Sequence, residues 1–263
     1  MYNPEQESLK SHENQEIDEE AKSLNKEIEP ELKEEARAFR ESGFPVDDLM
    51  RIDMRAFGKV FPPKTINNDI GEVAKNKTKF KKEPGKEIGD LLESTITLAI
   101  NRYLFKGRFA ALRTSEYDDI VGGLNKKEDN AVSADHLIID KESGEIIATI
   151  DTTTSYKNKV EKLRPMLKNG AKADYGVKWN KDDATVSLVS LKNLPVFFIK
   201  FESLEVIDLA KSVISQKMPE VQNKESIQKL LSSLVKQAEE YSKLASPAMK
   251  QPYERAAKIF KSL

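Results

Sequence analysis

The chain of 263 residues contains no cysteine and only two histidines, His12 and His136. Without cysteine, the protein cannot form disulfide bonds, use a thiolate nucleophile or build a cysteine-based zinc site. The two histidines are poorly placed for a serine–histidine–aspartate arrangement. The sequence also lacks a glycine-rich phosphate loop and a dinucleotide fingerprint. These absences exclude several common classes of enzyme.

Long apolar runs are also missing. The longest is far shorter than the roughly 20 residues that a helix needs to span a bilayer. Residues 1–7 lack the basic start and apolar stretch of a secretory signal. Hydrophobic residues make up 38% of the chain and charged residues 33%. We therefore expect a soluble protein that does not contact a membrane and is located in the cytoplasm.

The formal net charge of −1 is unevenly distributed along the chain. Residues 1–50 hold 15 acids and 6 lysines or arginines, which gives −9 and leaves about +8 for the remainder. An acidic arm beside a basic body is compatible with nucleic-acid binding, and equally with an arm that masks the basic face. The lysine-rich run that includes Lys79, Lys81 and Lys82 can contact phosphates, and the alternative is a solvated loop.

The spacing of apolar residues and turn signals divide the chain into parts. Apolar steps of three and four between Ile17 and Phe39 predict a helical stripe, which Pro30 is expected to break into two helices. Residues 1–14 are expected to be disordered. The predicted parts are an acidic arm (1–45), an irregular lysine-containing linker (46–85), a core (86–202) and a C-terminal helical segment (203–263).

The core alternates between helical and strand patterns. We expect helices at 86–105 and 156–170 and strands at 109–113, 133–139, 146–153, 175–179, 185–191 and 196–201. A turn at 140–144 would join two of these strands into an antiparallel hairpin. The alternation predicts a mixed α/β fold in which helices flank a central mixed sheet.

Four acidic residues stand out in this core: Glu93, Asp119, Asp135 and Asp151. An apolar strand rarely carries an unpaired acid, because burying a charge costs several kcal/mol or more. Asp135 and Asp151 lie on the two hairpin strands, so their carboxylates can converge on a cation. Such oxygens suit Mg²⁺ or Mn²⁺. The alternative is that each acid is a solvated strand end.

The order of these elements and acids resembles the PD-(D/E)XK nuclease superfamily, which has the restriction-endonuclease-like fold. The resemblance covers residues 86–201. Residues 113–120, 134–140 and 150–155 are similar to a group of predicted, uncharacterised members with a Tyr-Asp-Asp segment, an acid-plus-apolar strand and an Asp-x-Thr strand end. The loop between the first two of these segments is longer than in that pattern.

The resemblance implies a role for each acid. Asp135 matches the metal ligand of the second strand, Asp151 matches the acid of the (D/E)XK element, and Glu93 is the candidate acid of the first helix. Asp119 is an additional acidic ligand candidate. The lysine of the family falls at Thr153, which carries no charge to orient water or offset transition-state charge.

Four basic residues are further candidates. Lys157 or Lys159, on the following helix, can take the place of the missing lysine. Arg113 can contact a phosphate or pair with Glu116. Strand alternation places His136 on the face opposite to Asp135, which favours a packed or surface histidine over a ligand or base.

We therefore expect a metal-dependent DNA endonuclease that hydrolyses phosphodiester bonds with Mg²⁺ or Mn²⁺. One alternative is a catalytically impaired nucleic-acid-binding module with the same fold, marked by the missing lysine. Another is a non-enzymatic α/β interaction protein. In the endonuclease, the terminal helical segments would contact DNA, a partner or a second copy in a homodimer.

Overall fold

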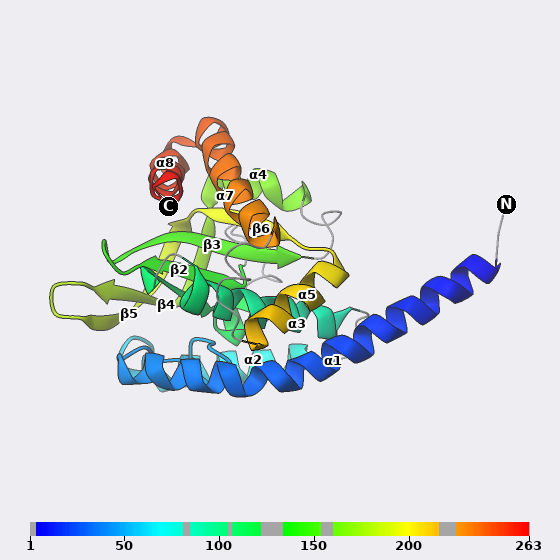
Figure 1. Cartoon of the computed structure of the whole chain (residues 1–263). Coiled ribbons are helices and arrows are strands. Elements are labelled where there is room, and N and C mark those ends of the chain that lie inside the picture. Colours follow the sequence, from blue (N-terminus) through cyan, green and yellow to red (C-terminus); the bar gives the residue numbers. More distant parts are fainter. Residues whose placement is uncertain are drawn as a thin grey trace.

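The computed structural model describes residues 4–80, 85–104, 107–121, 134–153, 160–215 and 225–262. It confirms the mixed α/β fold, with a central four-stranded mixed sheet and helices on its faces (Figure 1). The helices are α1 Pro4–Glu41, α2 Pro63–Phe80, α3 Lys86–Leu98, α4 Val160–Asn169, α5 Ser203–Ile214, α7 Glu225–Leu244 and α8 Pro247–Lys261. Shorter helical turns are η1 Met54–Lys59, η2 Ala99–Tyr103 and η4 Tyr117–Val121.

The central sheet has the strand order β1-β2-β3-β6. Its strands are β1 Phe109–Arg113, β2 His136–Asp140, β3 Glu145–Thr153 and β6 Val196–Lys200. β2 is antiparallel to both β1 and β3, and β6 is parallel to β3. A parallel neighbour requires a crossover. Here the crossover contains α4, β4 Ala171–Asn180 and β5 Thr185–Leu194.

The predicted hairpin of β2 and β3 is confirmed, and its turn is held by a network around Asp140. The carboxylate of Asp140 accepts hydrogen bonds from Arg108 Nε (2.8 Å), Arg108 Nη2 (2.9 Å) and the Ser143 hydroxyl (3.0 Å). Gly144 has φ +76°, and a Cβ there would lie 2.5 Å from the Trp179 carbonyl oxygen. Glycine is therefore required at this turn for both conformational and steric reasons.

The apolar stripe of the N-terminal helix is confirmed, but the predicted break at Pro30 is wrong. α1 continues through Pro30, and residues 4–14, expected to be disordered, belong to the same helix. Its buried stripe packs against α3 and α5 (Figure 1), and consists of Ala21, Leu24, Ile28, Leu32 and Ala36. Proline costs a helix one hydrogen bond and adds a steric clash. The continuous buried contact on both sides of Pro30 offsets that cost.

Residues 46–85 are more regular than expected, because they contain η1 and α2. The lysines of α2 obscured an apolar spacing of three and four at Ile66, Ile70 and Val73. Ile66 and Val73 are buried, and Ile70 packs against the core. The lysine run up to Lys79 is therefore part of a helix rather than a loop.

The other strands and helices agree with expectation, with one difference. β4 and β5 pair with each other in a separate two-stranded sheet instead of joining the central one. α7 and α8 cover the free edge of β6, where the Gln237 side chain accepts from the Phe198 amide (2.9 Å) and donates to its carbonyl (2.7 Å). Among the helices described, none is both long enough and apolar enough to traverse a lipid bilayer.

Arg102 on η2 fastens α1 to the body of the protein. Its guanidinium lies 2.5 Å from Glu31 Oε2 and 2.7 Å from Glu35 Oε2, and its side chain is 17% exposed. We predict that Arg102→Ala lowers the free energy of unfolding by about 2 kcal/mol, because two half-buried carboxylates then lose their counter-charge. Urea unfolding measures this loss. The matched control is Lys33→Ala, which removes an exposed Glu29 pair of α1 and should change little. Equal effects of both substitutions would contradict the prediction.

Candidate functional site

One end of the central sheet gathers the predicted functional residues. Arg113 on β1, His136 on β2 and Ile150 on β3 are successive partners across the strands. Asp151 and Thr153 follow Ile150 toward the end of β3. α3 packs against this part of the sheet and contributes Glu93. Residues far apart in the sequence therefore meet where β1 and β3 end and β2 begins.

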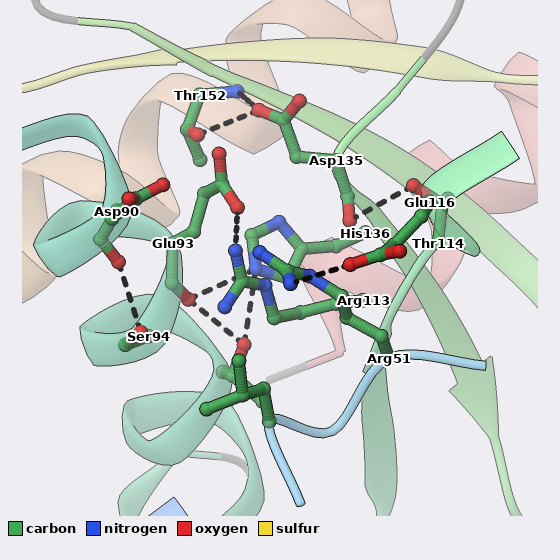
Figure 2. A network of polar contacts seen from close by, with 12 residues as sticks. Arg51, Asp90, Glu93, Ser94, Arg113, Thr114, Glu116, Asp135, His136 and Thr152 are labelled. Carbon is green, nitrogen blue, oxygen red and sulfur yellow. Dashed lines mark hydrogen bonds and ion pairs between the residues drawn. The ribbon is translucent and has the colours of Figure 1, made fainter. Parts of the chain in front are cut away.

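Asp135 lies against the end of β3. Its carboxylate oxygen Oδ2 accepts hydrogen bonds from the Thr152 amide (2.5 Å) and the Thr152 hydroxyl (2.6 Å), as Figure 2 shows. Its own amide donates to the Ile150 carbonyl (2.8 Å). Asp151, the residue between Ile150 and Thr152, is 2% exposed. The two hairpin acids are thus held at the same end of the same strand pair.

β2 and β3 pair in regular register from His136–Ile150 to Ile138–Ala148, and the register shifts between Ile138 and Ile139. Asp135 immediately precedes the first of these pairs. Its carboxylate contacts Thr152, whereas the ring of His136 contacts α3.

His136 is a packed histidine, as the sequence favoured, and it fastens β2 to α3. It is fully buried, and its Nε2 atom lies 3.1 Å from both the Glu93 carbonyl oxygen and the Thr97 hydroxyl oxygen. A carbonyl only accepts, so Nε2 carries the proton. Burial lowers the pKa of His136 to about 4, which keeps the ring neutral. The other ring nitrogen, Nδ1, is buried without a hydrogen-bond partner among the described residues.

The Glu93 carboxylate forms an ion pair with the Arg113 guanidinium (Figure 2). Burial acts to raise the pKa of Glu93, but the charges of Arg113, His136 and Arg51 and the hydrogen bond from Arg113 together outweigh it, so the pKa lies below its ordinary value. Arg113 is only 3% exposed. The Arg113 guanidinium thus pairs with Glu93 rather than with Glu116, and its expected contact with a phosphate stays a prediction.

Glu116 instead pairs with two other cations. Arg51 Nη1 lies 3.2 Å from Glu116 Oε1, and Lys77 Nζ lies 2.6 Å from the same oxygen. Arg51 comes from the segment before η1, which also contributes a backbone contact to β1. The sequence pattern gave no sign of Arg51, because its segment lacks periodicity and its partner is 65 residues away.

Two more acids lie near the Glu93–Arg113 pair without an arginine of their own. Burial, and then the charge of Glu93, raise the pKa of Asp119 to about 7, although Arg51 and Arg113 act against the shift. The same two causes raise the pKa of Asp90, one turn before Glu93 on α3. Asp119 is therefore only partly ionised near neutral pH, and the structure brings it into the electrostatic environment of Glu93.

Asp118 is a buried acid that the sequence analysis did not single out. Its carboxylate accepts from the Asp174 amide (2.7 Å), the Tyr175 amide (3.1 Å) and the Ser115 hydroxyl (2.7 Å). Burial raises its pKa to about 6, and these hydrogen bonds oppose the rise. Asp118 thus joins η4 to β4. Its spacing of three from Ser115, with no apolar periodicity, was the one local sign of such a role.

The remaining predicted residues divide into two groups. Thr153 is the partner of Lys200 on β6. Lys79 lies on α2, and its side chain is outside the described part of the chain. The following predicted residues lie outside the described residues altogether: Lys81, Lys82, Lys157 and Lys159.

The described residues contain no group of three or more histidine, cysteine, aspartate or glutamate side chains arranged to hold a metal ion. Magnesium sites need fewer protein ligands, since one or two carboxylates together with water and substrate phosphates commonly suffice. Asp135 and Asp151 supply carboxylate oxygens, the donor type that such an ion prefers, at one end of a hairpin. Glu93 is already matched by Arg113.

We compared the chain with protein-family models, with curated proteins and with solved structures, and none of the three comparisons finds a match.

The Glu93–Arg113 pair yields a first prediction for this site. We predict that Glu93→Gln lowers the free energy of unfolding by about 3 kcal/mol, because it leaves the Arg113 charge buried without a partner. Asp90→Asn on the same helix is the matched control. Ionisation of Asp90 is unfavourable in the folded protein, so this variant should be as stable as the parent or more stable. Chemical denaturation of both variants at pH 7 tests the contrast, and a larger loss for Asp90→Asn would refute it.

Asp119 yields a prediction about pH. Its folded-state pKa of about 7 exceeds its ordinary value of 3.8, so the protein favours the protonated form. This contribution is fully present below about pH 4 and is lost as the pH rises through 7. In metal-free buffer, Asp119→Asn should therefore nearly match the parent at pH 4 and exceed its stability by about 4 kcal/mol at pH 8. Thermal unfolding from pH 4 to 8 measures the difference. A stability difference that does not vary with pH would contradict the assignment.

Proposed function

We propose that the protein is a metal-dependent nuclease that hydrolyses phosphodiester bonds in DNA. The observation that carries the proposal is the placement of Asp135 and Asp151 at one end of the β2–β3 hairpin. Asp135 is fixed there by Thr152, and Asp151 is buried. A pair of carboxylates of this kind is what the resemblance to the PD-(D/E)XK superfamily implies for its metal ligands.

The order of elements supports the same proposal. α3 precedes three antiparallel strands, β1, β2 and β3, and α4 leads toward β6, which lies parallel to β3. The resemblance was based on this order of helix, three strands and helix, with acids at fixed places in it. Because a fold hosts many functions, the order of elements supports the proposal only together with the acids.

In this proposal Asp135 and Asp151 would hold Mg²⁺ or Mn²⁺. The bound ion supplies a water of lowered pKa and stabilises charge on the scissile phosphate. Thr152 keeps the Asp135 carboxylate in place, since its amide and hydroxyl both donate to one oxygen. Glu93 remains a proposed acid of the site and also has a structural task. It neutralises Arg113 and thereby holds α3 against the end of the sheet.

A second function is favoured by Thr153. Threonine carries no positive charge to offset the charge of the transition state, so the same fold could act as a DNA-binding module without cleavage. Lys157 or Lys159, which lie outside the described residues, is one proposed replacement for the lysine. Assembly into a homodimer through the helical segments and location in the cytoplasm are further proposals that come from the sequence.

Cleavage of supercoiled plasmid DNA in the presence of Mn²⁺ tests the proposed activity. We predict that the parent protein nicks or linearises the plasmid and that EDTA stops the reaction. Asp151→Asn should lower the rate at least about 100-fold, because losing a metal ligand removes several kcal/mol of transition-state stabilisation. The matched control is Asp182→Asn, an exposed acid between β4 and β5, which should cleave like the parent.

Two results would count against nuclease activity. If Asp151→Asn cleaves as fast as the parent, the assigned site is wrong. If the parent binds DNA in a gel-shift experiment but does not cleave it with either metal, the binding-module function is correct instead.

A further inference from the structure

Thr153 has a lysine beside it on the neighbouring strand. β3 and β6 are parallel, and Thr153 is the partner of Lys200 in their register. Paired residues of adjacent strands project to the same face of a sheet, as do residues two apart on one strand. Lys200 therefore lies on the same face as Thr153 and Asp151, one strand away.

The distance between adjacent strands is short enough for a lysine side chain to cross. Adjacent strands are about 4.8 Å apart, and the lysine ammonium sits at the end of a flexible four-carbon stem. Its side chain is 29% exposed, so it is partly covered and partly open to solvent. Lys200 is also the last residue of β6, and it lies at the end of the sheet where the hairpin acids lie.

The ammonium group of Lys200 forms an ion pair with Glu202, whose side chain is 65% exposed. Glu202 is the residue before α5, and its amide donates to Glu205 Oε2 (2.8 Å). An ion pair with so exposed a partner contributes little to stability. The pair with Glu202 is therefore only a weak constraint on the position of the ammonium group.

We propose that Lys200 is a catalytic residue that supplies the positive charge missing at Thr153. This inference rests on the proposed nuclease function and names a further residue of the same site. During hydrolysis the oxygen of a water molecule forms a bond to phosphorus, and the bond from phosphorus to the leaving oxygen breaks. The attacking water releases a proton to solvent, and the leaving oxygen takes one up. Lys200 stays protonated, contacts the phosphate oxygens and offsets their developing charge.

The test compares variants of the full chain in the Mn²⁺-dependent plasmid assay. We predict that Lys200→Met lowers the cleavage rate about 100- to 1,000-fold, as expected for loss of one charge-stabilising group. Mn²⁺ affinity should stay the same or increase slightly, because a nearby positive charge is removed and no ligand is lost. Lys200→Arg should retain part of the activity. Circular dichroism of each variant checks that the fold is kept.

A transfer experiment separates catalysis from folding. Adding Thr153→Lys to the Lys200→Met variant moves the positive charge to the neighbouring strand. We predict that this double variant cleaves at least about ten times faster than Lys200→Met alone. Glu202→Gln is the matched control for a purely structural role, because it breaks the same ion pair and leaves the lysine in place. It should cleave at the rate of the parent.

Each contrary outcome has its own meaning. If Lys200→Met cleaves at the parental rate while Asp151→Asn does not cleave, Lys200 is not catalytic and the nuclease function stands. If Glu202→Gln loses as much activity as Lys200→Met, Lys200 only anchors α5 and the inference is wrong. If the parent protein cleaves no DNA at all, the proposed function fails and this inference fails with it.

Discussion

The end of the central sheet depends on the ion pair between Glu93 and Arg113. Arg113 is almost completely buried, and a buried cation is tolerated only when an opposite charge and hydrogen bonds compensate for the lost water. Glu93 provides that compensation from α3, and the Glu93 carbonyl also accepts from His136. This helix is thereby fixed against β1 and β2 together. The same arrangement positions Asp135, because Asp135 immediately precedes His136, the first residue of β2.

The charges around this pair make ionisation of further acids in the site unfavourable. Asp90 and Asp119 lie close enough to Glu93 for its charge to raise their pKa values, and the available arginines are already engaged. Additional negative charge is thus unfavourable there until a cation arrives. A divalent ion at the hairpin acids would relieve this repulsion as well as bind substrate, so the excess of acids is consistent with the proposed metal site.

Sequence patterns were sufficient for elements that local rules determine. The hairpin of β2 and β3 and the helix that carries Glu93 follow from periodicity and turn residues. The uninterrupted α1 and the helix α2 were missed, because tertiary burial outweighed Pro30 and because lysines obscured the apolar spacing of α2. The partners of Arg113 and Glu116 were also missed, since the choice among nearby charges is made in three dimensions. Likewise, no local pattern revealed the register shift between Ile138 and Ile139 in the β2–β3 pair.

The central claim is that Asp135 and Asp151 together hold one divalent ion. Isothermal titration calorimetry of the metal-free protein with Mn²⁺ measures this most directly, because it needs no substrate. The account predicts a single binding site in the parent protein and its loss or strong weakening in Asp135→Ala. Absence of any binding heat in the parent, or an unchanged affinity in Asp135→Ala, would contradict it.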